Sequence, residues 1–278
     1  MNDNIIAAGI VLYNPDLQRL EENITAIIGQ VSNLILIDNN SDNIAGIQRI
    51  QSKYSNSLLV RNTKNEGIAF ALNQIVKEVN KLKAVWAITL DQDSVAPGNM
   101  VSEYVKYIDK KDVGLITCLI DDRNVGRAKT DTGVIEPITE VNSCITSGSM
   151  LNVNTAFKVG GFDERFFIDI VDFDFCKRIR LSGYKILRVN AVSLLHEVGH
   201  STKKRFLGKE IVVFNHSPLR NYYRTRNRIL YGRKYGELLT SFKKTSRRFF
   251  WVLLFEKNKI KNFAFIIKAY FDGLTMKL

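Results

Sequence analysis

Two carboxylates one residue apart, Asp91 and Asp93, follow an apolar run that begins at Ala84. Side chains two positions apart on a strand share one side, so both acids could face one cation. Their oxygens suit Mg²⁺ or Mn²⁺, and such a cation could neutralise the charge on a departing diphosphate. The same pattern also fits an acidic turn after a buried strand, so its meaning depends on the rest of the chain.

Three earlier segments with strand character also end in polar residues: Tyr13-Asn14, Asp38-Asn39 and Asn65-x-Gly67. In a parallel sheet these ends lie along one edge, where open α/β sheets bind ligands. The Asp38 carboxylate could accept the imide N–H of a uracil or thymine ring. A simple turn after a strand is the alternative for Asp38-Asn39.

A second acidic group, Asp169, Asp172 and Asp174, crowds the start of an expected helix among aromatic residues. A carboxylate placed there could act as the general base that takes a proton from a sugar hydroxyl. The alternative for Asp172 is a capping role, because the N-terminus of a helix favours negative charge.

Alternating strands and helices position the first group. Hydrophobic periodicity predicts strands at residues 5–13, 34–37, 58–61 and 84–90, with helices at 17–28, 44–50 and 68–79 between them. This order implies right-handed crossovers and a mostly parallel sheet, with Asn65 as the expected N-cap of the third helix. The Gly-rich phosphate-binding fingerprints are absent, so any nucleotide must be held by other means.

The second half of the sequence is predicted to form a mixed sheet, followed by a helical C-terminal region. We expect a helix near 100–108, a polar flexible loop at 121–133 and a helix over 173–181 that stops before Gly183. Further expected strands are 113–120, 135–141, 143–153, 184–189 and 191–195, and the expected tail helices are 222–235, 238–255 and 260–274.

Charge is concentrated near the C-terminus. The chain of 278 residues has a formal net charge of +12, and from Ser201 onward it has 19 Lys and Arg against four Asp and Glu. Such a tail favours an anionic partner, either nucleic acid or lipid headgroups. The three cysteines fit neither a zinc spacing nor a disulfide framework, which favours a reducing cytoplasm. No apolar run approaches the ~20 residues that a spanning helix needs.

In this order the motifs resemble the inverting glycosyltransferases of family 2, which have the nucleotide-sugar-binding GT-A fold. The resemblance covers roughly residues 5–201, and its second half is similar to bacterial rhamnosyltransferases. It is carried by Tyr13-Asn14, Leu34-Ile-Leu-Ile-Asp-Asn-Asn-Ser41, Asn65-Glu-Gly67, Asn73, Asp91-Gln-Asp93, Ser147-Gly-Ser-Met150, Gly160-Gly-Phe-Asp163, Phe166-Phe-Ile-Asp-Ile-Val-Asp172, Cys176-x-Arg178, Gly183-Tyr184, His196-x-x-Gly199 and Arg220-Asn-Tyr-Tyr-x-x-Arg-Asn227.

The resemblance implies roles for these residues. Asp93 would be the main ligand of Mn²⁺ or Mg²⁺, and His196 a metal or diphosphate ligand. Asp172 matches the catalytic base, but Val171 replaces the usual preceding Glu, which leaves Asp169 as an alternative base. Asp38 would hold the nucleotide base and Asp91 the ribose or the metal. The full donor-binding set is Tyr13, Asn14, Asp38, Asn39, Asn65, Gly67, Asn73, Asp91, Gln92, Arg224 and Arg226.

The domain prediction is a GT-A catalytic domain at 1–205, with a nucleotide-sugar half (1–95) and an acceptor half (96–205), followed by a basic amphipathic helical region at 206–278. Arg224 and Arg226 could reach the diphosphate of the donor or of a lipid acceptor, or bind RNA with the neighbouring tyrosines. The aromatic stretch 249–255 is typical of an interfacial membrane helix, and packing on the body or in a homodimer is its alternative.

The expected fold is therefore α/β, and the expected function is transfer of L-rhamnose from dTDP-rhamnose to a polyprenyl-diphosphate-linked saccharide in bacterial cell-surface polysaccharide synthesis. The enzyme would work at the cytoplasmic face of the cell membrane. A UDP-sugar donor is the nearest alternative. A nucleotidyltransferase and a non-catalytic RNA-binding protein are alternatives of other classes.

Overall fold

The computed structural model describes residues 5–122, 126–127, 136–196, 202–206, 209–213, 216–256 and 258–278. The chain divides into two compact units. The first unit comprises Met1–Arg165 and Val171–Glu197, and the second comprises Phe166–Ile170 and Val198–Leu278. The second unit thus combines five residues from the middle of the chain with a longer segment that starts at Val198 and contains the helical region predicted at 206–278.

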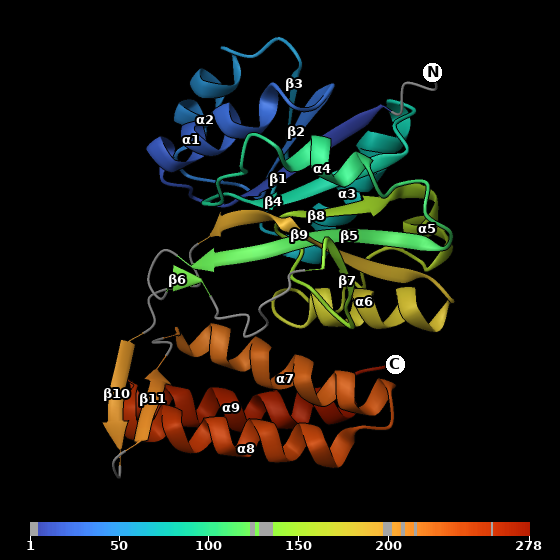
Figure 1. Ribbon diagram of the computed structural model, residues 1–278. Helices are drawn as coiled ribbons and strands as arrows, with labels where there is room; N and C mark the ends of the chain where they lie inside the picture. Colours follow the sequence, from blue (N-terminus) through green and yellow to red (C-terminus); the bar gives the residue numbers. More distant parts are fainter. Residues whose placement is uncertain are drawn as a thin grey trace. The chain divides into compact units, whose positions relative to one another are not determined.

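A parallel half-sheet forms the first part of the first unit, as the sequence predicts (Figure 1). The strand β1 (Ile6–Leu12) has a parallel neighbour on each side, so that Leu12 lies beside Asp38 and Val11 lies beside Asp91. The ends of these strands therefore lie at one edge of the sheet. The strands, in spatial order, are β3 (Ser57–Arg61), β2 (Asn33–Asp38), β1 (Ile6–Leu12) and β4 (Trp86–Asp91).

Helices with one apolar face cover this half-sheet, and they are α1 (Leu17–Ile28), α2 (Ile44–Gln51) and α3 (Ile68–Lys81). Gly9 is required where α3 crosses β1, because a Cβ atom there would lie 2.4 Å from the Ile75 side chain. The expected N-cap of α3 is wrong by two residues. The cap is Gly67, at φ 87°, and Asn65 instead accepts a hydrogen bond from the Gly67 N–H through Oδ1.

The second half of the sheet is mixed, as predicted. Strand β8 (Ser149–Asn152) runs antiparallel between β4 and β5 (Val113–Asp122), and β9 (Lys185–His196) runs parallel to β5. Shorter strands at the margin are β6 (Gly126–Arg127) and β7 (Ile138–Glu140), and the remaining helices are α4 (Met100–Val105), α5 (Val153–Lys158) and α6 (Val171–Leu181).

Two expectations for this half need correction, and a third is not tested. Of residues 143–153, only Ser149–Asn152 form a strand. This strand ends at Asn152, because the Asn152 side chain accepts a hydrogen bond from the Thr155 N–H and caps α5. The two short strands expected at 184–195 are one strand, β9, which absorbs the interruption as a register shift against β5. The flexible loop expected at 121–133 falls largely outside the described residues.

The second unit contains α7 (Pro218–Lys234), α8 (Leu238–Phe255) and α9 (Lys259–Thr275), and a hairpin of β10 (Thr202–Phe206) and β11 (Lys209–Val213). The sequence analysis missed the hairpin. Gly273 allows α9 to approach α7 closely, because a Cβ there would lie 2.8 Å from the Arg226 carbonyl oxygen. Across the described part of the chain, no helix is both long and apolar enough to cross a membrane.

Candidate active site

Asp91, Asp93 and His196 come together at the edge of the sheet where β4 and β9 end. Their ligand atoms lie within 4.8 Å of one another. His196 Nε2 is 3.9 Å from Asp91 Oδ2, and its Nδ1 is 3.6 Å from Asp93 Oδ1. The His196 side chain is only 11% exposed, whereas the carboxylates are 36% and 30% exposed. The cluster is therefore anchored on the imidazole side and open to solvent on the carboxylate side.

Polar contacts from buried residues orient this cluster. The Ser94 hydroxyl lies 3.0 Å from His196 Nδ1 and 2.7 Å from the Ser147 hydroxyl, which accepts a hydrogen bond from the Asp91 N–H. Asn23 Nδ2 donates to the Asp91 carbonyl oxygen at 2.7 Å. The sequence analysis missed these positioning roles, although a fully buried Asn on the apolar face of α1 is a usable signal.

A divalent cation fits these residues. The two carboxylates suit Mn²⁺ or Mg²⁺, and the imidazole adds a nitrogen donor that a transition-metal ion such as Mn²⁺ accepts more readily than Mg²⁺. When Nδ1 carries the proton and donates it to Ser94, the lone pair of Nε2 remains for a metal, which is the usual role of an outer hydrogen bond to a ligating histidine. An isolated bridge between Val95 and Leu195 brings His196 beside Asp93, although the two are far apart in sequence.

Hydrogen bonds between side chains and backbone groups join the residues that follow β1, β2 and β4. The Tyr13 N–H donates to Gln92 Oε1 at 2.9 Å, and Gln92 Nε2 donates back to the Tyr13 carbonyl oxygen at 3.3 Å. Asn14 Oδ1 accepts from the Asp42 N–H at 2.7 Å, and the Asn14 N–H donates to the Ser41 hydroxyl. Tyr13 is 48% exposed, so its ring can pack against a ligand at this edge.

Asp38 is fully buried at the end of β2. Both carboxylate oxygens accept from the Ser41 N–H at 3.2 Å, and Oδ2 lies 3.4 Å from Arg61 Nε. Asn39 bridges to the neighbouring loops, since its Nδ2 donates to the Gly67 carbonyl and its Oδ1 accepts from Asn62 Nδ2. The structure thus gives Asp38 and Asn39 turn-stabilising contacts at the edge where they were expected to hold a base.

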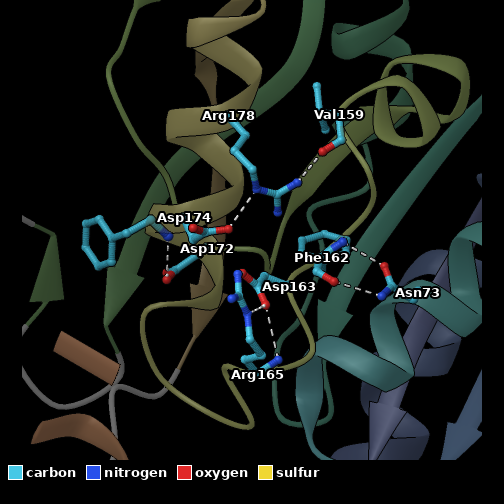
Figure 2. A network of polar contacts seen from close by, with 9 residues as sticks. Asn73, Val159, Phe162, Asp163, Arg165, Asp172, Asp174 and Arg178 are labelled. Carbon is cyan, nitrogen blue, oxygen red and sulfur yellow. Dashed lines mark hydrogen bonds and ion pairs between the residues drawn. The ribbon is translucent and has the colours of Figure 1, made fainter. Parts of the chain in front are cut away.

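Asn73 fastens α3 to the turn that follows α5 (Figure 2). Its Oδ1 accepts from the Phe162 N–H at 2.7 Å, and its Nδ2 donates to the Phe162 carbonyl oxygen and to Glu164 Oε1. Gly161, at φ 67°, is needed for this approach, because a Cβ there would lie 2.6 Å from Asn73 Oδ1. In this arrangement the side chain of Asn73 organises a loop.

The two acids of α6 lie in different surroundings (Figure 2). The Asp174 side chain is fully buried and accepts a hydrogen bond from Arg178 Nε at 2.8 Å, while Arg178 Nη1 donates to the Val159 carbonyl. Asp172 instead lines a small pocket, and one of its oxygens accepts from the Phe173 N–H. Asp174 is therefore committed to a structural ion pair, whereas Asp172 borders a small pocket.

Two cysteines line the same pocket as Asp172. Cys144 and Cys176 are free thiols with their sulfur atoms 3.8 Å apart, although they are 32 positions apart in sequence. A hydrogen bond from Cys176 lowers the pKa of the Cys144 thiol, and the same bond raises the pKa of Cys176. The sequence analysis found no relationship between these cysteines, because separation along the chain does not reveal proximity between the segment before β8 and the helix α6.

Asp169 belongs to the second unit and lies in a strained backbone segment. Asp169 and Ile170 have φ values of 63° and 69°, and such angles are a genuine outlier for a β-branched residue. Asn227 Nδ2 donates to the carbonyl oxygens of Ile168 at 2.7 Å and Asp169 at 3.2 Å. The ring of Phe167 stacks on Tyr223 at 4.7 Å, so α7 holds this segment from two sides.

The two arginines predicted to reach a diphosphate differ. Arg226 is buried, donates to its neighbour Asn227 Oδ1 through Nε and Nη2, and lies 4.9 Å from the Tyr223 ring centre. These contacts fix the amide that holds the Asp169 segment. Arg224 is half-buried, and its Nη1 lies 3.1 Å from His216 Nε2.

Solved structures with the same fold include S. aureus TarS (residues 1–349), which aligns with 98% of this chain and 81% of its own at a TM-score of 0.60 and 11% identity. GalNAc-T7 crystallised with UDP, GalNAc and Mn²⁺ aligns with 81% of this chain and 47% of its own at a TM-score of 0.59 and 17% identity. These likenesses show the fold, and it is the GT-A fold expected from the sequence motifs.

The chain belongs to glycosyl transferase family 2, whose profile matches residues 8–163. It is 29% identical to the dTDP-rhamnosyl transferase RfbF of Shigella flexneri over 99% of this chain and 96% of that protein. It is 23% identical to the rhamnosyltransferase WbbL of Escherichia coli K12 over 56% of this chain and 68% of that protein. The family and fold expected from the sequence motifs are confirmed.

Proposed function

We propose that the enzyme transfers L-rhamnose from dTDP-rhamnose to a saccharide on a lipid diphosphate carrier, with inversion at the anomeric carbon. The observation that carries the choice of donor is the similarity to a dTDP-rhamnosyl transferase along nearly the whole of both chains. Similarity confined to the catalytic half would support only glycosyl transfer in general, since one fold serves many donors.

The donor site in this proposal is the polar edge of the parallel half-sheet. Asp93, Asp91 and His196 would hold Mn²⁺ or Mg²⁺, which when bound supplies positive charge beside the leaving diphosphate. Tyr13, 48% exposed at the same edge, offers a ring face to the thymine. Asp38 would accept the imide N–H of the base, and its contacts with Ser41 and Arg61 keep the carboxylate in one orientation.

Asp172 is the proposed general base. It lines a pocket in the first unit with Thr146 and Cys144, whereas Asp174 is paired with Arg178 and Asp169 lies beside Arg220 in the second unit. Asp172 would take the proton of the acceptor hydroxyl as that oxygen attacks the anomeric carbon and the bond to the diphosphate breaks. A single displacement of this kind inverts the configuration at that carbon.

The second unit is the proposed membrane contact. Exposed apolar residues recur along α9 at intervals of three and four, which places them on one face of the helix. They are Ile260 (87% exposed), Phe263 (50%), Ile267 (50%), Phe271 (67%) and Leu274 (39%). Lysines in the same helix, such as Lys261 and Lys268, suit an anionic surface. A homodimer through α8 and α9 is the competing use of this face.

Nucleoside diphosphate release from a panel of dTDP- and UDP-sugars tests the donor assignment. We expect dTDP from dTDP-rhamnose, in the presence of an extracted lipid-linked acceptor, and no UDP. NMR of the product should show an anomeric configuration opposite to that of the donor. Turnover of UDP-sugars with none of dTDP-rhamnose would overturn the choice of donor but leave the family membership intact.

Flotation with liposomes tests the membrane contact. We expect binding to vesicles that contain anionic lipid, weaker binding to zwitterionic vesicles, and loss of binding in the double variant Phe263→Ser, Phe271→Ser. Lys158→Ser, an exposed position on α5 of the first unit, is the control. Light scattering should show a monomer before and after the changes, and a dimer that these changes dissociate would favour the competing use.

A further inference from the structure

Three arginines of the second unit, Arg220, Arg224 and Arg248, form what we call the arginine cluster. Arg220 and Arg224 lie one turn apart on α7, and Arg248 lies on α8. Arg248 pairs with Glu256, which also accepts a hydrogen bond from Asn221 of α7, and burial and then the charge of Arg224 lower the pKa of Arg248 to about 10. Two helices thus bring like charges together.

The carboxylates that face the arginine cluster, among the described residues, are Asp169 and Glu256. Arg220 Nε is 3.6 Å from Asp169 Oδ2, and Arg248 Nη2 is 3.6 Å from Glu256 Oε1. Glu256 is shared further, because Asn221 Nδ2 donates to its Oε2 at 2.8 Å. In the part of the chain that the structure describes, the three guanidinium groups of the cluster thus outnumber the two carboxylates that face them.

The start of α7 adds to that positive charge. The Ser217 hydroxyl accepts from the Arg220 N–H and caps the helix, and the first turn contains no acid. The N-terminus of a helix carries a partial positive charge and ordinarily favours acids nearby. At the start of α7, arginines take the place of the usual acids. The neighbouring His216 is uncharged near neutral pH, because burial and then the charges of Arg220, Arg248 and Arg224 lower its pKa to about 3.

The arginine cluster is accessible from solvent on one side. Arg220 is 44% exposed and Arg248 is 22% exposed at the side chain, whereas their partners Asp169 and Glu256 are 19% and 4% exposed. The acids are thus less exposed than the arginines, and because Nε and Nη2 of Arg248 are themselves buried, an approaching anion would meet Arg220 first. Guanidinium groups bind phosphate oxygens through pairs of parallel N–H bonds, so several of them suit a diphosphate.

We propose that the arginine cluster is a binding site for a diphosphate ester. The inference rests on the proposed function for the source of that group, which is either the nucleoside diphosphate of the donor or the diphosphate that links the acceptor to its lipid. The diphosphate-binding role predicted for Arg224 is thus extended to Arg220 and Arg248. The cluster replaces Arg226, whose guanidinium is occupied within α7 by Asn227.

Calorimetric titration with inorganic pyrophosphate, in EDTA so that no metal contributes, tests the site directly. We expect binding by the full-length protein and at least tenfold weaker binding by Arg220→Gln, Arg224→Gln and Arg248→Gln. Arg247→Gln, an exposed arginine next to Arg248 on α8, is the matched control and should bind like the wild type. Arg248→Lys keeps the charge without the fork and should lie between.

Equal pyrophosphate affinity in the wild type and all three glutamine variants would overturn the proposal, as would loss in the Arg247→Gln control alone. Because Arg220 is the most exposed of the three, its variant keeps the test valid if the other two fail to fold. Binding that is present in an enzyme inactive on dTDP-rhamnose would refute the proposed donor and leave this inference standing.

Kinetics then separate the two sources. If the cluster takes the diphosphate of the lipid carrier, Arg220→Gln raises KM for the lipid-diphosphate acceptor and leaves KM for the donor unchanged. The effect should disappear with an acceptor in which an uncharged alkyl group replaces the diphosphate. If the cluster takes the nucleoside diphosphate, the variant raises KM for the donor with either acceptor.

Discussion

Asn227 holds the backbone of Ile168, because its side-chain amide donates to the Ile168 carbonyl oxygen at 2.7 Å. Arg226 fixes that amide in turn by donating to Asn227 Oδ1 at 2.9 and 2.7 Å. The held segment directly precedes α6, the helix that carries Asp172 in its first turn. Arg226 and Asn227, which belong to a basic motif in the sequence, therefore support the strained segment that contains Asp169 and Ile170.

Asn227→Ala should destabilise the second unit by about 1–3 kcal/mol, since it removes the donor to two partly buried carbonyl oxygens and the acceptor of a buried guanidinium. Urea unfolding followed by tryptophan fluorescence measures the change, because Trp251 lies in that unit. Thr240→Ala, at an exposed site on α8, should change stability by less than about 0.5 kcal/mol. An equal effect of both substitutions would contradict the supporting role.

Asp172→Asn and Asp174→Asn should fail in different ways. Loss of a general base lowers turnover by ~10²–10⁴-fold with folding intact. Asp174→Asn removes the charge that faces Arg178 in a buried ion pair, which costs about 3–5 kcal/mol of stability. Paired measurements of kcat and of the unfolding midpoint distinguish the two. A stable but inactive Asp174→Asn enzyme would indicate that Asp174, and not Asp172, is the general base.

Metal removal should abolish transfer, and Mn²⁺ should raise the melting temperature of the wild-type enzyme, because a ligand that binds only the folded state stabilises it. Asp93→Asn and His196→Gln should lose most of that rise. Asp109→Asn, at an exposed acid remote in sequence from the cluster, should keep it. A rise of equal size in Asp93→Asn would place the cation elsewhere.

Stability should fall with acid partly through His216. Its pKa is lowered to about 3 in the folded protein, whereas an unfolded histidine titrates near pH ~6.5. Between these values the unfolded chain binds a proton that the folded chain does not, so the free energy of unfolding decreases as the pH drops below about 6.5. His216→Asn should reduce this decrease between about pH 7 and pH 5.

The control for that prediction is the comparison at about pH 8, where the imidazole is neutral in both states. Any difference between His216→Asn and the wild type there reports the lost hydrogen bond with Arg224 alone. A wild type and variant whose unfolding midpoints change in parallel across the whole range would exclude His216 as a source of acid sensitivity.

The positions of the candidate site residues that end regular strands were predictable from the sequence. Asp91 and Asp38 end apolar runs of ordinary strand length, and parallel pairing of neighbouring strands then brings the ends together without further information. His196 was found through a family motif. Its place beside Asp93 depends on a single bridge between Val95 and Leu195, which no periodicity reveals.

The parts that could not be predicted depend on contacts between distant segments. The Cys144–Cys176 pair and the Ser94–Ser147 bond join residues 32 and 53 positions apart. Asn65 is a residue type that often caps helices. The cap position, however, has a φ of 87°, which glycine adopts with less steric strain than other residues, and Gly67 occupies it. Arg226 looks like a ligand-binding cation in sequence, and only burial assigns it a structural role.

The chain crosses from the first unit into the second at Phe166 and returns at Val171 before the second unit is completed from residue 198 onward. The two units are thus interleaved along the chain and not joined end to end. A protein truncated after β9 would keep Phe167 and lose Tyr223, its stacking partner. Chimeras that exchange only the C-terminal helices between relatives should inherit a mismatched loop before α6, and a functional exchange must carry Phe166–Ile170 along with those helices.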